Sequence, residues 1–213
     1  MTAMTKIERV NSLEDLMPIG LAAGANVRTP CGPRRVENLR RGDLIVTRRD
    51  GLQPVRMIWT RTVTDAEMAA DPSLAPIVLR PRAIGPMMPQ MDVRIAAAHR
   101  ILVPGYRLEG NSDTEPALVQ ARDIVGSSDA SYIDRAAAEV TFYNLVFDSH
   151  QVFTANGLPV ESFMPSQTSL FGLTEDVRNQ LLNAVPVLRD GEEAYPGPEY
   201  PVQDNANYKP EWA

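Results

Sequence analysis

A chain of 213 residues, of which 44% are hydrophobic and 23% charged, is long and apolar enough to form one sizeable core as a soluble globular protein. Its formal net charge of −6 argues against a nucleic-acid or anionic-membrane surface, because both need clustered lysine and arginine. The single cysteine, Cys31, excludes an intramolecular disulfide framework and any zinc site built from several cysteines. We therefore expect one domain with tails and no nucleic-acid partner.

The N-terminal segment has no apolar stretch after Lys6, and nowhere in the chain do about eighteen apolar residues follow one another. We expect neither a signal peptide nor a membrane span, and hence a cytoplasmic protein or one exported without an N-terminal signal peptide. Residues 11–16 predict a short capped helical turn that Pro18 closes. Residues 1–19 are interpreted as an N-terminal leader.

From Gly24 onward, frequent turn residues separate short apolar and β-branched runs, a pattern typical of a β protein. Asp50-Gly51 is the strongest single hairpin signal in the chain. Residues 60–76 predict a looser connection with one helical turn. Extended segments are expected at 25–29, 34–39, 44–47, 55–59 and 77–79, and a short helix near 119–125.

Residues 142–157 carry His150, one of only two histidines in the chain. Two apolar runs, rich in β-branched and aromatic residues, flank a polar Asp-Ser-His segment that begins at Asp148. The second run stops at Asn156-Gly157, a dipeptide that tolerates the positive φ of a tight turn. The pattern predicts a β-hairpin with Asp148 and His150 in its turn.

The last part of the chain, residues 166–213, differs from the rest. Thr174 precedes an acidic first turn and apolar residues at helical spacing, which predicts a helix over residues 174–182. Beyond Pro186 prolines and polar residues are frequent, so we expect an extended segment that is either packed along the surface or disordered. Residues 166–213 are interpreted as a C-terminal helix and Pro-rich tail.

Two of these stretches carry a family resemblance. Residues 24–47 follow the order Gly-x-x-Val-x-Thr-Pro-x-Gly-x-x-x-Val-x-x-Leu-x-x-Gly-Asp-x-x-x-Thr, which is similar to the first block of Hint domains, the Hedgehog/intein autoprocessing module. Residues 142–157 resemble the C-terminal block of the same module, and the short bacterial members are the most similar. The resemblance implies an all-β, horseshoe-like domain with pseudo-two-fold symmetry over residues 20–165.

The resemblance also implies where a site lies. In Hint domains a first Cys or Ser attacks the preceding carbonyl, and a histidine donates a proton to the departing amide nitrogen. His99 matches that histidine, with Ala96 where the family has a hydroxyl residue. Aligning the family pattern Cys-Phe-x-x-Gly-Thr on Gly24 puts Gly20 at the nucleophile position. Because glycine has no nucleophile, we expect autoprocessing (self-cleavage or protein-splicing) ancestry with an impaired or lost acyl shift.

The downstream end also departs from the family. Inteins finish in Val-His-Asn before a Cys, Ser or Thr, whereas Val160 is followed here by Glu-Ser-Phe, so no asparagine stands there to cyclise. Asn144 replaces an aspartate that is common in the family. We predict that His99, His150 and Asp148 mark the site.

Other interpretations stay open. The domain could be a binding or structural module that presents a cleft or the Pro-rich tail to a protein partner. His99, His150 and Asp148 have the composition of a metal-binding triad, which would suit a metal-dependent enzyme. A serine hydrolase using Ser162 is weaker, because no nucleophile elbow supports it. Cys31 would lie roughly 20 Å from the nucleophile position. We expect a monomer with no cofactor and no bound metal.

Overall fold

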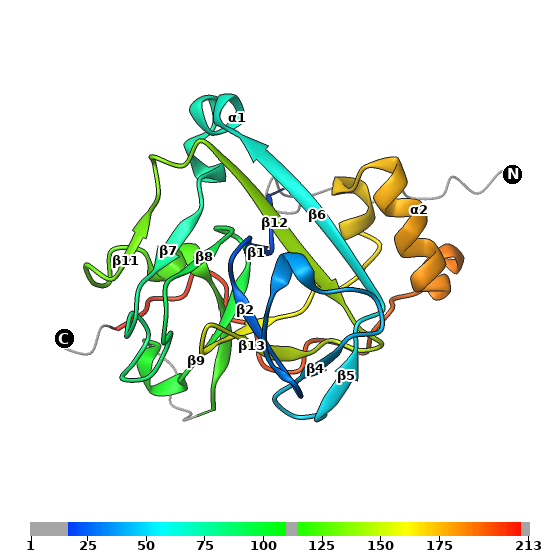
Figure 1. The fold of residues 1–213 in the computed structure, drawn as a ribbon, viewed down its shortest axis with the longest axis horizontal. Helices are drawn as coiled ribbons and strands as arrows, with labels where there is room; N and C mark the ends of the chain where they lie inside the picture. Colours follow the sequence, from blue (N-terminus) through cyan, green and yellow to red (C-terminus); the bar gives the residue numbers. More distant parts are fainter. Residues whose placement is uncertain (1–16, 110–114, 210–213) are drawn as a thin grey trace, which may run out of the picture.

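The computed structural model describes residues 17–109 and 115–209, which form two six-stranded antiparallel sheets and a two-stranded one (Figure 1). The strand orders are β11-β7-β8-β1-β12-β6, β10-β9-β14-β13-β2-β3 and β4-β5. The predicted all-β class is confirmed. The strands are β1 (Leu21–Ala22), β2 (Asn26–Thr29), β3 (Gly32–Arg35), β4 (Leu44–Val46), β5 (Leu52–Pro54), β6 (Met57–Thr64), β7 (Ile77–Leu79), β8 (Val93–Ile95), β9 (Arg100–Val103), β10 (Ala117–Gln120), β11 (Ser131–Ile133), β12 (Glu139–Val146), β13 (Val152–Ala155) and β14 (Leu158–Glu161).

Two α-helices and several short 3-10 helices lie between the strands or, for η6, α2 and η7, after the last strand. They are α1 (Asp65–Ala70), α2 (Glu175–Ala184), η2 (Val36–Asn38), η3 (Pro72–Leu74), η4 (Gly105–Arg107), η5 (Ala121–Ile124), η6 (Ser169–Gly172) and η7 (Pro186–Asp190). Within the described part of the chain, no helix is long and apolar enough to cross a membrane. The helical turn predicted over residues 11–16 lies outside the described residues.

The two long strands β6 and β12 pair along their whole length, and helix α2 lies beside them (Figure 1). Met57 and Trp59, alternate residues of β6, are buried in a cluster with Phe163 and Leu181 of the C-terminal part. The rings of Trp59 and Phe163 meet edge to face with 5.1 Å between centroids. Apolar burial therefore fixes α2 against the end strand of the first sheet.

The predicted hairpin over residues 142–157 is wrong. Strand β12 has β1 on one side and β6 on the other, so neither edge is left for β13, which pairs with β14 and β2 in the second sheet. The Asp-Ser-His segment at 148–150 is thus the crossover between the two sheets. The Asn156-Gly157 turn is confirmed: both residues have positive φ, 50° and 83°, and they join β13 to β14.

Other local predictions have mixed outcomes. The hairpin signal Asp50-Gly51 does join β4 to β5, and Thr174 does cap α2 by accepting a hydrogen bond from the backbone of Val177. The connection predicted over 60–76 is instead strand up to Thr64, which forms a capping box at the start of α1. The helix predicted near 119–125 is the end of β10 followed by η5.

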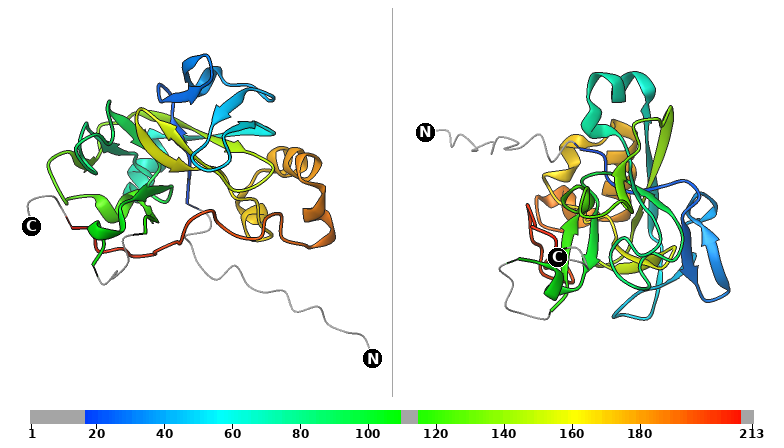
Figure 2. Two further views of the ribbon diagram at one scale, coloured as in Figure 1. Left: turned by 90° about the horizontal axis from the view of Figure 1, so that it is seen from below. Right: turned by 90° about the vertical axis from the view of Figure 1, so that its left-hand side faces the viewer.

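The described part of the tail packs along the surface, one of the two alternatives expected from its composition (Figure 2). Tyr195 and Tyr208 are buried, and their hydroxyls donate to the carbonyl oxygens of Phe147 and Ile84 at 2.6 and 2.7 Å. The backbone of Leu118 in β10 exchanges hydrogen bonds with residues 201–203. The tail therefore covers one edge of the second sheet, at β10.

Candidate active site

Two residues of the loop between β8 and β9 form hydrogen bonds with the backbone of Gly20. The backbone N–H of Gly20 donates to Nδ1 of His99 at 3.1 Å, and the backbone N–H of Ala96 donates to the carbonyl oxygen of Gly20 at 3.0 Å. The loop is closed by a hydrogen bond from the His99 backbone to the Ala96 carbonyl, also 3.0 Å. Ala96 thus acts here through its backbone, which needs no side-chain hydroxyl.

Asn144 in β12 holds the residue before Gly20. Its Nδ2 donates to the carbonyl oxygen of Ile19 at 3.1 Å. The N–H and the C=O of the Ile19–Gly20 peptide bond therefore both have side-chain partners, His99 and Asn144. An aspartate at position 144 would need to be protonated to donate in this way.

Gly20 has no room for a side chain. Its φ is +115°, in a region that other residues rarely adopt. A Cβ placed on it would lie 2.7 Å from the carbonyl oxygen of Tyr143 and 2.9 Å from Nδ2 of Asn144. The first of these is a backbone atom, so the contact can be relieved only by moving a strand.

His99 is a neutral, buried imidazole. Burial lowers its pKa to about 4, an effect that the charge of Glu161 partly opposes. Because Nδ1 accepts a hydrogen bond from a backbone N–H, the ring proton belongs on Nε2. At neutral pH the lone pair of Nδ1 faces the Gly20 nitrogen, and no proton is available there for donation.

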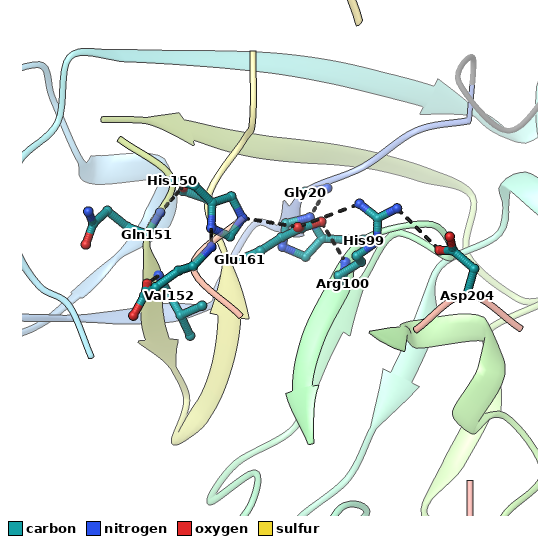
Figure 3. Close-up of polar contacts among 10 residues, drawn as sticks. Gly20, His99, Arg100, His150, Gln151, Val152, Glu161 and Asp204 are labelled. Atoms are coloured by element: carbon teal, nitrogen blue, oxygen red, sulfur yellow. Dashed lines mark hydrogen bonds and ion pairs between the residues drawn. The ribbon is translucent and has the colours of Figure 1, made fainter. Parts of the chain in front are cut away.

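His150 lies in the crossover after β12 and has different partners (Figure 3). Its Nδ1 accepts from the backbone N–H of Glu199 at 3.1 Å, so Nε2 carries the proton and faces Oε2 of Glu161 at 3.4 Å. Glu161 lies between the two imidazoles (Figure 3) and is 7% exposed. The structure therefore brings His99 and His150 together around one carboxylate.

Glu161 is an ionised carboxylate held by several donors. Burial raises its pKa, but the hydrogen bond from His150 and the charge of Arg100 outweigh that effect and lower the pKa overall. The backbone N–H of Arg100 donates to Oε1 at 3.1 Å, and its guanidinium lies 3.9 Å from Oε2. The same guanidinium lies 3.5 Å from Asp204 of the tail. The tail thus contacts this network at both ends, through Glu199 and Asp204.

Asp148 does not join the histidines. It is exposed and forms an ion pair with Arg56, with 2.7 Å between Oδ1 and the guanidinium Nε. Although it is two residues from the buried His150, it lies on the surface side of the crossover. In the part of the chain that the structure describes, no three His, Cys, Asp or Glu side chains are arranged to hold a metal ion. Cys31 is exposed in the turn between β2 and β3.

A cavity of about 340 Å³ opens beside this site. Residues 17–19 and 161–164, which flank the site in the sequence, both line it, together with Trp59 of β6. Gln120 and Arg100 line the same cavity. The cavity therefore lies where the two ends of the domain, near Gly20 and near Glu161, approach each other.

The fold is all-β, and the site places two buried histidines beside Glu161. A family model described as "Hint domain" matches residues 19–167, and the chain belongs to that family. The resemblance inferred from the sequence is confirmed.

Solved intein structures also match this chain, at low sequence identity and with TM-scores below 0.5. A bacterial intein-like domain from Clostridium thermocellum is 15% identical, with 68% of this chain and 99% of that chain covered and a TM-score of 0.44. The MchDnaB-1 intein (variant N145AA) is 14% identical, with 68% and 100% covered and a TM-score of 0.44. The gp41-1 intein is 11% identical, with 67% and 98% covered and a TM-score of 0.40. A search of curated proteins gave no match.

Sequence reasoning missed three parts of this site. Glu161 was noted only as a departure from the intein ending, although its place beside Arg100 and His150 makes it the centre of the network. From the sequence, Asn144 is only a departure from the family aspartate, whereas in the structure its amide donates to the carbonyl oxygen of Ile19. Glu199 could not have been found, because nothing in a Pro-rich tail indicates which backbone N–H will meet His150.

Proposed function

We propose that this Hint-family domain no longer cleaves itself at the Ile19–Gly20 bond and that the bond persists as part of the folded site. One observation carries the proposal: the two polar groups of the peptide bond are held by His99 and Asn144, while Gly20 has neither a nucleophile nor space for one. An N-to-S or N-to-O shift needs a thiol or hydroxyl on that residue.

The state of His99 supports the same proposal. Amide cleavage requires protonation of the departing nitrogen, and a histidine with its pKa lowered to about 4 is neutral at pH 7. The hydrogen bond runs from the Gly20 N–H to the imidazole, which is the wrong direction for an acid. The hydrogen bond from Asn144 polarises the Ile19 carbonyl, but polarisation without a nucleophile or an acid leaves the amide stable.

The test is the intact mass of the purified full-length chain, incubated with and without dithiothreitol or hydroxylamine. We expect a single species at the full-length mass in every condition. Gly20→Cys is the informative variant: because its Cβ would meet the Tyr143 carbonyl, we expect it to stay whole as well. Wild-type fragments separated between Ile19 and Gly20 would overturn the proposal.

A second candidate function, binding of a protein partner, is favoured by the cavity of about 340 Å³ beside the Ile19–Gly20 bond. The tail, by contrast, is already engaged with His150 and with β10. We therefore place the binding surface at the cavity rather than at the tail. For the metal-dependent alternative, the placement of Asp148 offers no support.

A further inference from the structure

The charges of this chain are divided unevenly between one segment and the rest. Residues 25–56 contain eight arginines and three acidic residues, a net charge of +5, whereas the remaining residues carry a net charge of −11. Residues 25–56 form the hairpins β2–β3 and β4–β5, with η2 between them, and the two hairpins lie together on one side of the molecule (Figure 2). The net charge of −6 thus results from a basic lobe, residues 25–56, on an acidic protein.

The acidic side chains of the lobe have partners in its own loops or outside it. Asp43 pairs with Arg34 at 2.8 Å and so ties β3 to the loop before β4. Glu37 and Asp50 accept hydrogen bonds from residues outside the lobe. Four exposed arginines of the lobe form no ion pair with any residue that the structure describes, namely Arg28, Arg40, Arg41 and Arg48. Their positive charge therefore faces the solvent without an acidic partner among the described residues.

The β4–β5 hairpin has an apolar outer face. Its register puts Leu44 opposite Pro54 and Val46 opposite Leu52, so these four side chains share one face of the two-stranded sheet. Ile45, on the other face, is fully buried, whereas Leu44 and Leu52 are 42% and 48% exposed. Arginines lie at both ends of the outer face, in the loop before β4 and in the turn between β4 and β5. The exposed leucines are thus bracketed by positive charge.

This combination suits the surface of an anionic lipid bilayer. Guanidinium groups pair with lipid phosphates, and exposed leucines gain free energy when they enter the boundary between headgroups and acyl chains. The acidic remainder of the protein is repelled by the same bilayer, which turns the lobe towards it.

Nucleic acid and a protein partner fit the lobe less well. The lobe contains no aromatic residue on which a base could stack, and phosphates alone would leave the leucines exposed to water. The apolar face consists of four side chains, which is much less than the roughly 800 Å² that a stable protein interface buries on each partner. Membrane attachment needs only a few inserted side chains when several positive charges support them.

We propose that the basic lobe binds the surface of an anionic phospholipid bilayer, with Leu44 and Leu52 at the acyl boundary and the four unpaired arginines on lipid phosphates. The net charge of the whole chain argued against such a surface, but the clustered arginines that it needs are present in the lobe. The proposal goes beyond the proposed function and does not depend on it, because the Ile19–Gly20 bond lies outside the lobe.

The test is co-sedimentation of the full-length chain with vesicles of phosphatidylcholine alone or of phosphatidylcholine and phosphatidylglycerol. We expect binding only to the vesicles that contain phosphatidylglycerol, and at least about tenfold weaker binding in roughly 0.5 M salt than in roughly 0.05 M salt. Arg41→Glu and Arg48→Glu should each weaken binding at least about tenfold, because each replaces an attracted charge by a repelled one. Leu52→Asn should weaken it about fivefold without a change in charge.

Arg135→Glu is the matched control. Arg135 is exposed and lies beside α1, at the opposite end of the molecule from β4–β5 (Figure 1), so its substitution should change binding by less than about twofold. Failure to bind phosphatidylglycerol vesicles, or equal losses for Arg135→Glu and Arg48→Glu, would overturn the inference. Equal affinity for a DNA duplex, with no effect of Leu52→Asn on either ligand, would identify a general polyanion surface and would overturn it as well.

Discussion

His99 and His150 are both buried beside Glu161, yet their surroundings give them different roles. The ring of His99 accepts a hydrogen bond from the backbone N–H of Gly20 and is neutral, with its pKa lowered to about 4. His150 lies between the carboxylate of Glu161 and a backbone N–H of the tail. One histidine is therefore tied to a peptide bond, and the other to an ion-pair network that the C-terminal extension completes. The tail thus contacts His150 and Arg100, the two residues that flank the Glu161 carboxylate.

The largest expected effect on stability comes from substituting Gly20, the hydrogen-bond partner of His99. Gly20→Ala should lower the free energy of unfolding by about 3 kcal/mol, because the positive φ is unfavourable for alanine and the new Cβ meets the Tyr143 carbonyl. Gly24→Ala is the matched control: its φ is +91°, but nothing lies within 4 Å of the added Cβ, so about 1 kcal/mol is expected. Urea denaturation measures the unfolding free energy of both variants. Equal losses would show that residue 20 can move away from Tyr143 to make room for a side chain.

The surroundings of His150 are tested by Glu161→Gln, a substitution that keeps the shape of the side chain and removes its charge. We expect a loss of about 2 kcal/mol in unfolding free energy, because Arg100 and the ring of His150 lose a buried carboxylate. The His150 amide and ring resonances should move further than those of His99. A loss below about 0.5 kcal/mol would contradict the central place given to Glu161.

The two histidines should also differ in how they link stability to pH. The pKa of His99 is about 4 in the folded state and 6.5 in the unfolded state, so the unfolded chain binds the proton first as the pH falls. The stability of the folded state that depends on a neutral His99 is fully present above pH 6.5 and is lost as the pH falls towards 4. Between pH 7 and pH 5 we expect a loss of roughly 1.5 kcal/mol.

His99→Gln isolates that contribution in the same denaturation series. The raised pKa of Glu199, caused mainly by burial, acts in the opposite direction, and it is present in both proteins. The difference in unfolding free energy between wild type and His99→Gln should therefore fall by roughly 1.5 kcal/mol from pH 7 to pH 5. A constant difference would show that His99 is protonated in the folded state at pH 5.

Asp148 should have the smallest effect of the residues first grouped with the histidines. Its ion pair with Arg56 is exposed, so Asp148→Asn should change the free energy of unfolding by less than about 0.5 kcal/mol. The histidine resonances should not move. A change in the chemical shifts of the histidines would show that Asp148 interacts with the site.

Whether a feature of the fold or of the site could be predicted from the sequence depended on how far apart along the chain the interacting residues lie. Local signals worked: the Asn156-Gly157 turn and the Thr174 cap are set by the φ preferences and side chains of the residues themselves. The apparent hairpin over 142–157 failed because strand partners are chosen by the whole sheet, and β12 had two better partners. The pairing of His99 with Gly20 was reachable only through the family resemblance, since the two are 79 residues apart. The contact of Glu199 with His150 left no local signal at all.

The most direct test of the account is the nitrogen spectrum of the two histidines and of Gly20 in the full-length chain at several pH values. A Gly20 amide signal exists only if the Ile19–Gly20 bond is intact, because a free terminal amine exchanges its protons too fast to be seen. We predict that this signal is present, that Nδ1 of His99 is unprotonated, and that His99 remains neutral at pH 6. A missing Gly20 amide, or a His99 that titrates near 6.5, would contradict the account.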